Sequence, residues 1–248
     1  MNEGREDCFS IADNLQFVRG RIQAACERSG RRPEDVTLIA VSKLKPFSDI
    51  LEAGAAGAED FGENYVQELT QKTELNESLD EPRPIRWHMI GHLQKNKVKY
   101  LIGRAALIHS VDSVPLAEQI EKEAAKREQV MRILLEVNIA GEESKWGFDP
   151  DGVIRAAQEI ASFSHVRVLG LMTSAPFTEE PETNRVYFRG LNSLAKELAA
   201  KELLSVTDPD FRGPVLSMGM TGDFEVAVEE GATMVRVGTA IFGRRNYE

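Results

Sequence analysis

A lysine at the end of a predicted buried strand is the residue best suited to chemistry in this sequence. Segment 36–43, VTLIAVSK, is a short apolar run rich in β-branched residues, which predicts a buried parallel strand. Side chains alternate between the faces of a strand, so Ile39, Val41 and Lys43 share one face, with the amine at the carboxyl end. Ligands of α/β sheets bind at that end. A desolvated amine there can form a Schiff base with an aldehyde, although this segment alone favours an ordinary solvated lysine.

A second candidate is an arginine in the last predicted strand, segment 234–240. Arg236 shares a face with Met234 and Gly238, and a guanidinium that faces a barrel interior needs a partner. Two partners remain open on the sequence alone. A carboxylate on a neighbouring strand would make Arg236 part of the scaffold, whereas a ring nitrogen of a ligand would make it part of a binding site.

Two small, hydroxylated segments at the ends of the last two predicted strands could bind a phosphate. Segment 217–221, SMGMT, precedes a predicted helix whose N-terminus offers free amides, and Gly238 and Thr239 end the last strand. In a (β/α)8 barrel the loops after strands seven and eight are the usual phosphate site. Each segment alone is a weak indication, because α/β turns need glycine anyway. An amine, an interior arginine and a phosphate site together match pyridoxal 5'-phosphate, which has an aldehyde, a ring nitrogen and a phosphate.

The elements that must position these residues are eight predicted strands that alternate with helices. This alternation indicates βα units and a parallel sheet, and 248 residues is a usual length for one (β/α)8 barrel. We therefore predict an α/β fold, a single TIM barrel over residues 1–248, with an open doubly wound sheet as the alternative. The predicted strands are 36–43, 58–64, 85–90, 106–111, 131–139, 166–172, 215–220 and 234–240. The predicted helices are 10–27, 48–56, 65–75, 93–101, 115–127, 151–163, 183–200 and 223–230.

The composition narrows the classes of function that remain. A formal net charge of -10 repels a phosphate polyanion and argues against nucleic acid as a partner. No segment approaches the length of a membrane span, and no apolar secretory core follows the charged start of the chain. Cys8 and Cys26 lack the spacing of metal ligands and suit a reducing cytosol. We expect a cytoplasmic protein with no membrane partner, and a monomer.

The sequence resembles the pyridoxal phosphate homeostasis protein family, also called the YggS or PROSC family. The matching segments run through nearly the whole chain in family order, which makes the resemblance specific. They are AVSKLKP at 40–46, FGENY at 61–65, WHMIGHLQKNK at 87–97, SKWG at 144–147, LMTSAP at 171–176, LSMGMTGDFE at 216–225 and VRVGTAIFGRR at 235–245. One small departure is Thr221, where the family pattern has serine, and the hydroxyl is kept.

This resemblance implies a barrel of the alanine racemase N-terminal type that carries pyridoxal 5'-phosphate as an internal aldimine on Lys43. It also implies a set of further cofactor-binding residues. These are Asn64 near the ring, Arg236 at the ring nitrogen, Ser217, Gly238 and Thr239 near the phosphate, and Met218.

Three further side chains have two interpretations each. His88 and His92 flank Gly91, but a metal site needs more ligands than the neighbouring sequence supplies, so we expect core packing or a place at the mouth and no metal. Lys145 follows the fifth predicted strand, at the same mouth as Lys43. It is either an exposed loop lysine or a second amine that accepts the cofactor by transimination.

Three functions are open at this point: a carrier of the cofactor, an amino-acid racemase or decarboxylase, and a barrel enzyme with a phosphorylated substrate. An arginine stays protonated, so a ring nitrogen set against Arg236 stays unprotonated, which disfavours decarboxylases and transaminases. In the resembling racemases a second base comes from an additional β domain and a partner chain, and here the sequence ends at Glu248, soon after the last strand. We expect a carrier that maintains intracellular pyridoxal phosphate, not an enzyme, with pyridoxal-phosphate-dependent apo-enzymes as recipients. A racemase-like enzyme is the alternative.

Overall fold

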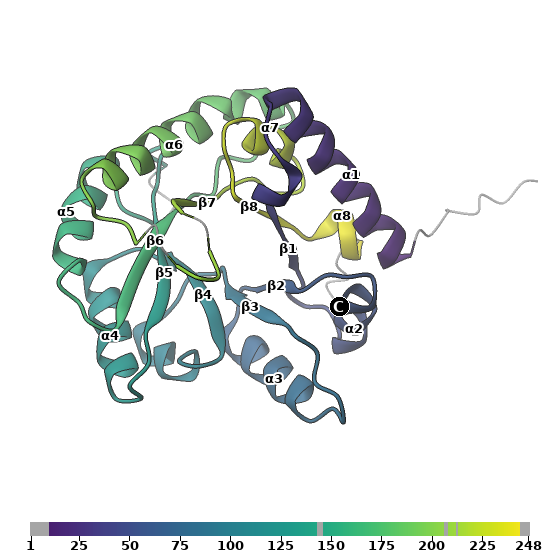
Figure 1. Ribbon diagram of the computed structural model, residues 1–248, viewed down its shortest axis with the longest axis horizontal. Coiled ribbons are helices and arrows are strands. Elements are labelled where there is room, and N and C mark those ends of the chain that lie inside the picture. Colours follow the sequence, from purple (N-terminus) through teal and green to yellow (C-terminus); the bar gives the residue numbers. More distant parts are fainter. Residues whose placement is uncertain (1–9, 143–145, 206–207, 212, 244–248) are drawn as a thin grey trace, which may run out of the picture.

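The computed structural model describes residues 10–142, 146–205, 208–211 and 213–243, which form a closed barrel of eight parallel strands (Figure 1). The strands follow one another around the barrel in chain order, and the last strand closes the ring by pairing with the first. The predicted (β/α)8 barrel is confirmed, and the open sheet is not observed. The strands are β1 Thr37–Val41, β2 Asp60–Glu63, β3 Arg86–Met89, β4 Ala105–Val111, β5 Met131–Glu136, β6 Val166–Met172, β7 Val215–Ser217 and β8 Met234–Val237.

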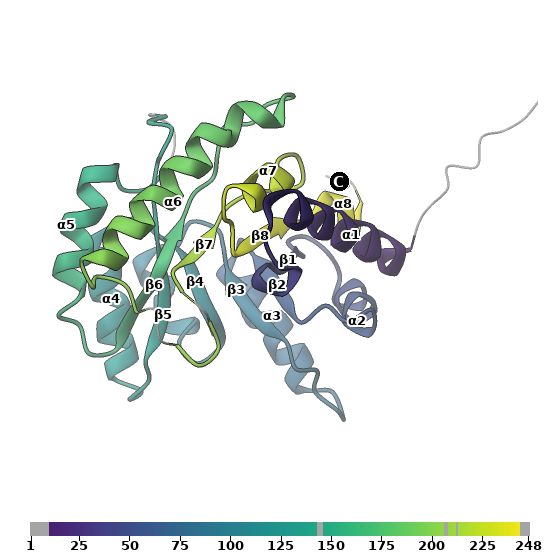
Figure 2. The same cartoon turned by 45° about the horizontal axis from the view of Figure 1, so that its top comes forward.

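The helices lie outside the ring of strands, with α1 beside α7 and α8 (Figures 1 and 2). Helix α1 begins with a capping box between Ser10 and Asp13 and ends at Gly30, whose φ of 66° suits glycine. The helices are α1 Ile11–Ser29, α2 Phe47–Ala55, α3 Val66–Glu77, α4 Val114–Ala125, α5 Pro150–Ile160, α6 Arg185–Ala200, α7 Phe224–Glu229 and α8 Thr239–Phe242. Three short 3-10 helices are η1 Pro33–Asp35, η2 Lys95–Tyr100 and η3 Pro181–Asn184.

The core has two parts, which lie on opposite faces of the strands. A large apolar layer fills the space between strands and helices, and it contains Cys26 of α1. A smaller apolar cluster includes Ile39, Leu107, Leu134 and Met234, which alternate along their strands with residues of the large layer and therefore face the barrel interior. The interior also contains buried polar side chains, and these become important for the candidate site. They are Asp60, His88, His109, Ser217 and Arg236.

Several predicted elements end earlier than the sequence pattern indicates. The last strand stops at Val237, because the chain turns at Gly238 into the short helix α8. Segment 93–101 was predicted as an α-helix, but it forms only the shorter 3-10 helix η2, Lys95–Tyr100. Among the described residues, no helix combines the length and the apolar character needed to cross a bilayer. Cys8 lies outside the described residues.

Candidate functional site

Five of the seven predicted site residues line one cavity at the carboxyl-terminal mouth of the barrel. The cavity has a volume of about 550 Å³, a size common for small-molecule sites. Its walls come from segments that follow β1, β2, β3, β6, β7 and β8, so residues far apart in the sequence meet there. The predicted residues that line it are Lys43, Asn64, Arg236, Gly238 and Thr239.

Lys43 lies in a turn rather than at the end of a strand. Strand β1 stops at Val41, two residues before Lys43, although both residues line the cavity as the predicted shared face requires. The next residue, Leu44, has a φ of 59°, a left-handed conformation that costs a non-glycine residue about 1–3 kcal/mol. Contacts with the rest of the barrel must therefore hold this turn.

A buried group of charged residues supplies those contacts on both sides of the lysine. The Ser42 hydroxyl donates to Glu63 Oε1 at 2.6 Å, and the Leu44 amide donates to Glu68 Oε1 at 2.7 Å. The Lys72 ammonium donates to the carbonyl oxygen of Ser42 at 2.8 Å and to Oε1 of both glutamates at 2.7 Å. We refer to Glu63, Glu68 and Lys72 as the clamp, because together they bind the residues on both sides of Lys43, namely Ser42 and Leu44.

The clamp contains a carboxyl group with an incomplete set of partners. Glu63 is fully buried, and its Oε2 has no hydrogen-bond partner among the described atoms. Burial raises the pKa of Glu63 above its usual range, although the Lys72 ammonium and the Ser42 hydroxyl oppose that effect. Glu63 therefore changes protonation closer to neutral pH than an exposed glutamate does.

Arg236 faces the barrel interior, as its strand position predicts, and is held by neutral groups. Its Nη1 donates to Ser217 Oγ at 2.7 Å, and its Nη2 donates to the carbonyl oxygen of Thr173 at 2.9 Å. Within the described chain, no carboxylate forms an ion pair with it. Burial lowers the pKa of Arg236 to about 10, with the more distant Glu136 and Asp223 opposing, so the guanidinium is charged at neutral pH. The carboxylate partner considered from the sequence is not observed.

Ser217 and Met218 are predicted site residues that do not line the cavity. The Ser217 hydroxyl is fully buried and is within hydrogen-bond distance of both Arg236 Nη1, at 2.7 Å, and His109 Nδ1, at 2.8 Å. Met218 is fully buried in the apolar layer between strands and helices. Thr221, in the loop after β7, lines the cavity instead and supplies a hydroxyl there.

Glycines bring two of the lining segments close to their neighbours. A side chain at Gly91 would clash with the backbone of Asn64, so glycine is needed where the segment after β3 packs against the segment after β2. Gly219, with a φ of 88°, leaves no room for a side chain against Phe224 and Ala227 of α7. Close packing therefore explains why glycine occupies these two positions.

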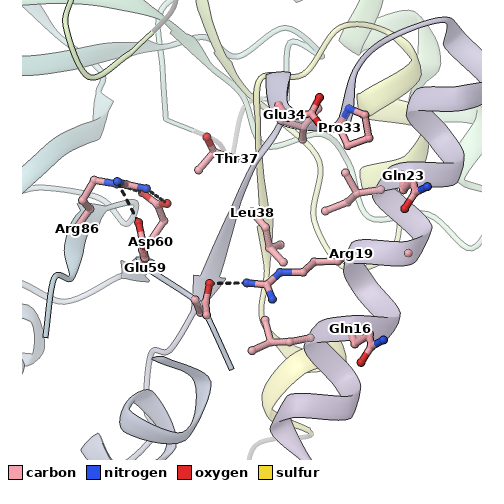
Figure 3. Close-up of a pocket in the computed structure, with 16 residues that line it drawn as sticks. Gln16, Arg19, Gln23, Pro33, Glu34, Thr37, Leu38, Glu59, Asp60 and Arg86 are labelled. Atoms are coloured by element: carbon pink, nitrogen blue, oxygen red, sulfur yellow. Dashed lines mark hydrogen bonds and ion pairs between the residues drawn. The ribbon is translucent and has the colours of Figure 1, made fainter. Parts of the chain in front are cut away.

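Another hollow, of about 630 Å³, lies at the opposite end of the barrel between α1 and the first strands (Figure 3). Its two arginines are occupied with protein partners. Arg86 pairs with Asp60 at 2.6 Å and with Glu59 at 3.4 Å, and Arg19 donates to the carbonyl oxygens of Ala56 and Gly57. We place the candidate site at the smaller cavity, because that cavity contains the turn with Lys43 and the interior guanidinium.

His88 and His92, which the sequence also singled out, do not line the cavity. His88 is buried in the barrel interior, whereas His92 lies near the surface, stacked on Trp146 with ring centroids 4.2 Å apart and 3.2 Å from Asp112. Among the described residues, no cluster of histidine, cysteine and acidic side chains could hold a metal ion. Lys145 lies outside the described residues.

The fold and the cavity define a barrel of the alanine racemase N-terminal class. The family model described as the alanine racemase N-terminal domain matches residues 14–246. An alanine racemase from Clostridium difficile has a TM-score of 0.72 at 12% identity, covering 95% of this chain and 61% of its own, which shows a shared fold.

Curated relatives of similar length identify the family more narrowly. A pyridoxal phosphate homeostasis protein from Aquifex aeolicus is 45% identical over 96% of this chain and 100% of its own length. The protein of the same name from Escherichia coli is 38% identical over 96% of this chain and 97% of its own. PipY of Synechococcus elongatus, in a structure with PLP bound, has a TM-score of 0.78 at 34% identity and covers 94% of this chain and 100% of its own. The chain belongs to the pyridoxal phosphate homeostasis protein family.

Proposed function

We propose that this protein binds pyridoxal 5'-phosphate at the carboxyl-terminal mouth of the barrel and maintains the intracellular pool of that cofactor. The observation that carries the proposal is the meeting of Lys43, Arg236 and the segment Gly238–Thr239 at one cavity. An amine, a permanent cation and a small hydroxylated segment are the groups that an aldehyde, a pyridine nitrogen and a phosphate require. The relatives' names and the PLP-bound PipY structure support the same cofactor.

The residues present fit this cofactor, and each has a separate task. When bound, pyridoxal phosphate would supply an aldehyde, and the Lys43 amine would be the nucleophile that holds it. The clamp orients that amine by fixing the turn around it. Arg236 would face the ring nitrogen, Asn64 would lie beside the ring, and the hydroxyls of Thr239 and Thr221 would donate to the phosphate. Ser217 supports this site from the barrel interior through Arg236, and Met218 packs behind it in the apolar layer between strands and helices.

We propose a carrier rather than an enzyme. A protonated Arg236 keeps the ring nitrogen unprotonated and so weakens the ring as an electron sink. A racemase also needs a second base, and among the described lining residues Asp223 is the acidic candidate. Its carboxylate already accepts hydrogen bonds from Asn184 Nδ2 at 2.8 Å and from the Met220 amide at 2.7 Å. These contacts favour a structural role for Asp223, so we expect no substantial turnover.

The carrier works, in this proposal, as a cytoplasmic monomer that releases pyridoxal phosphate to apo-enzymes that depend on it. Lys145 is a candidate second amine for that release. A racemase-like enzyme remains the alternative function. Exchange of the α-proton of amino acids in heavy water separates the two, because an enzyme would exchange it at about 1–1,000 per second.

Borohydride labelling tests the central claim. The protein loaded with pyridoxal phosphate is reduced and digested, and we expect the modified peptide to be the one that contains Lys43. Lys43→Ala should abolish the modification, whereas Lys126→Ala, on the surface of α4, should leave it unchanged. A reduced adduct found mainly on Lys97 would show that the assignment of the amine is wrong.

A further inference from the structure

A continuous line of buried polar side chains crosses the barrel interior below the cavity. Arg236 Nη1 lies 2.7 Å from Ser217 Oγ, which lies 2.8 Å from His109 Nδ1. His109 Nε2 lies 2.9 Å from His88 Nδ1, and His88 Nε2 lies 2.9 Å from Asp60 Oδ1. Both histidines and the serine are fully buried, so these contacts are shielded from bulk solvent.

The chemistry of the groups at the two ends fixes the direction of the first and the last hydrogen bond. At one end, Asp60 is an acceptor only: although burial opposes it, hydrogen bonds from Arg86 and His88 lower the pKa of Asp60 to about 2. His88 Nε2 must therefore donate to Asp60. At the other end, a guanidinium has no acceptor atom, so Arg236 must donate to Ser217.

The middle of the line then has one arrangement that satisfies every atom. The Ser217 hydroxyl accepts from Arg236 and donates to His109 Nδ1, His109 Nε2 donates to His88 Nδ1, and His88 Nε2 donates to Asp60. Both rings are neutral in this arrangement and carry their hydrogen on Nε2. Burial, assisted by the positive charge of Arg236, lowers the pKa of His109 well below its ordinary value, which agrees with a neutral ring.

The reverse arrangement leaves a buried group unsatisfied. If His88 were charged, its Nδ1 would donate to His109 Nε2, and His109 Nδ1 would donate to Ser217. The Ser217 oxygen would then accept from both sides, and its own hydrogen would have no acceptor among the contacts described for it. A buried polar hydrogen without an acceptor costs about 1–3 kcal/mol, so the neutral arrangement is favoured.

We propose that His88 and His109 are positioning residues, which act through Ser217 to hold the Arg236 guanidinium in one orientation at the cavity. The line of buried polar side chains contacts Arg236 at Nη1, through Ser217. The other terminal nitrogen, Nη2, donates to the carbonyl oxygen of Thr173 at 2.9 Å. The guanidinium cannot rotate without breaking one of these bonds. Its remaining N–H groups therefore point in a fixed direction, which matters for the ring nitrogen of the cofactor under the proposed function.

The first experiment needs neither a variant nor the cofactor. Nitrogen-15 NMR of the histidine rings in the apo protein at pH 7 reports the charge and the tautomer of each ring. We expect His88 and His109 to be neutral with the hydrogen on Nε2. A charged ring, or a hydrogen on Nδ1 of either ring, would overturn the direction of the line whether or not the protein binds pyridoxal phosphate.

The second experiment tests the positioning role with His109→Phe and a matched control. His109 does not line the cavity, so a change in binding must pass through Ser217 and Arg236. We expect the dissociation constant for pyridoxal phosphate to rise about tenfold, equivalent to about 1.4 kcal/mol, and the absorption maximum of the bound cofactor to shift. The control is His165→Phe. His165 lies outside the cavity lining, and its Nδ1 is 2.9 Å from Glu121 Oε1. This variant should change neither the dissociation constant nor the absorption maximum.

A third variant separates orientation from general loss of stability. His109→Gln keeps one donor and one acceptor and should recover part of the affinity and of the spectrum. Affinity and spectrum unchanged in folded His109→Phe, or equal losses in the glutamine and phenylalanine variants, would overturn the positioning role. Failure of the wild-type protein to bind pyridoxal phosphate would contradict the proposed function instead, and would leave the NMR result standing.

Discussion

Replacement of Lys72 by methionine removes the cation at the centre of the clamp with little change in side-chain volume. The ammonium makes three hydrogen bonds, at 2.7–2.8 Å, to Ser42, Glu63 and Glu68. Glu63 is fully buried, so the substitution leaves its carboxylate without a counter-charge. Removing one partner of a buried ion pair costs about 3–5 kcal/mol, and we expect a loss of that size in the free energy of unfolding of the apo protein.

The loss should depend on pH, because a protonated Glu63 does not need the cation. The pKa of Glu63 is higher in the folded protein than in the unfolded chain. Its contribution to stability is therefore fully present at pH values below the unfolded pKa, and it is lost as pH rises through the folded pKa. Lys72→Met raises the pKa of Glu63 further. The loss in the free energy of unfolding caused by Lys72→Met should therefore be larger at pH 8 than at pH 5. Adding Glu63→Gln to the Lys72→Met variant should reduce this loss.

Urea denaturation at pH 5 and pH 8 measures the free energy of unfolding of each variant, and Lys126→Met is the control. Lys126 pairs with Glu123 at 2.6 Å on the surface, and an exposed pair of this kind contributes little to stability because solvent screens it. A Lys72→Met loss no larger than that of Lys126→Met at pH 8 would refute the reasoning. We also expect pyridoxal phosphate to react more slowly with Lys43 in the variant, since the turn is no longer held on both sides.

Three further outcomes are expected. Arg236→Leu should weaken cofactor binding by about 1.5–3 kcal/mol, measured by absorbance titration, while melting of the apo protein shows less than the 3–5 kcal/mol loss of a broken ion pair; the opposite pattern would make Arg236 part of the scaffold. Gly91→Ala should destabilise the fold by about 1–3 kcal/mol through its clash with Asn64, whereas Gly54→Ala, in an open position of helix α2, should not. Burial and then Asp112 raise the pKa of Glu136 to about 7, so stability from this group falls as pH rises from 5 to 8, and Glu136→Gln should flatten that slope.

The barrel could be predicted from the sequence because its strands are short apolar runs between amphipathic helices. Segment 36–43 is an example: its alternation placed Val41 and Lys43 on one face, and both line the cavity. The ends of strands were less predictable. Thr239 was expected in a strand and begins α8, because the chain turns where Gly238 packs against Val41.

The partners of the site residues could not be predicted in the same way. Glu68 and Lys72 have the i,i+4 spacing of an ordinary surface pair, and the sequence does not reveal that Lys72 is buried against the turn. The line of buried polar side chains in the barrel interior is easier to detect in the sequence. Asp60, His88 and His109 are polar residues within predicted buried strands or at their ends, and each needed a partner. Their common partners come from different strands, so the connection becomes visible only when the barrel closes.

The candidate site lies at the seam where the barrel closes, and this links ligand binding to the completion of folding. Lys43 follows β1, whereas Arg236 and Gly238 belong to β8 and its end, and β1 and β8 pair with each other. These segments are separated by most of the chain, so they meet only after the slowest, longest-range contacts have formed. A newly synthesised chain should acquire the cavity last of all, after β8 has joined β1. A ligand that binds there would therefore favour the closed ring over every opened state, and its retention would report that the ring is complete.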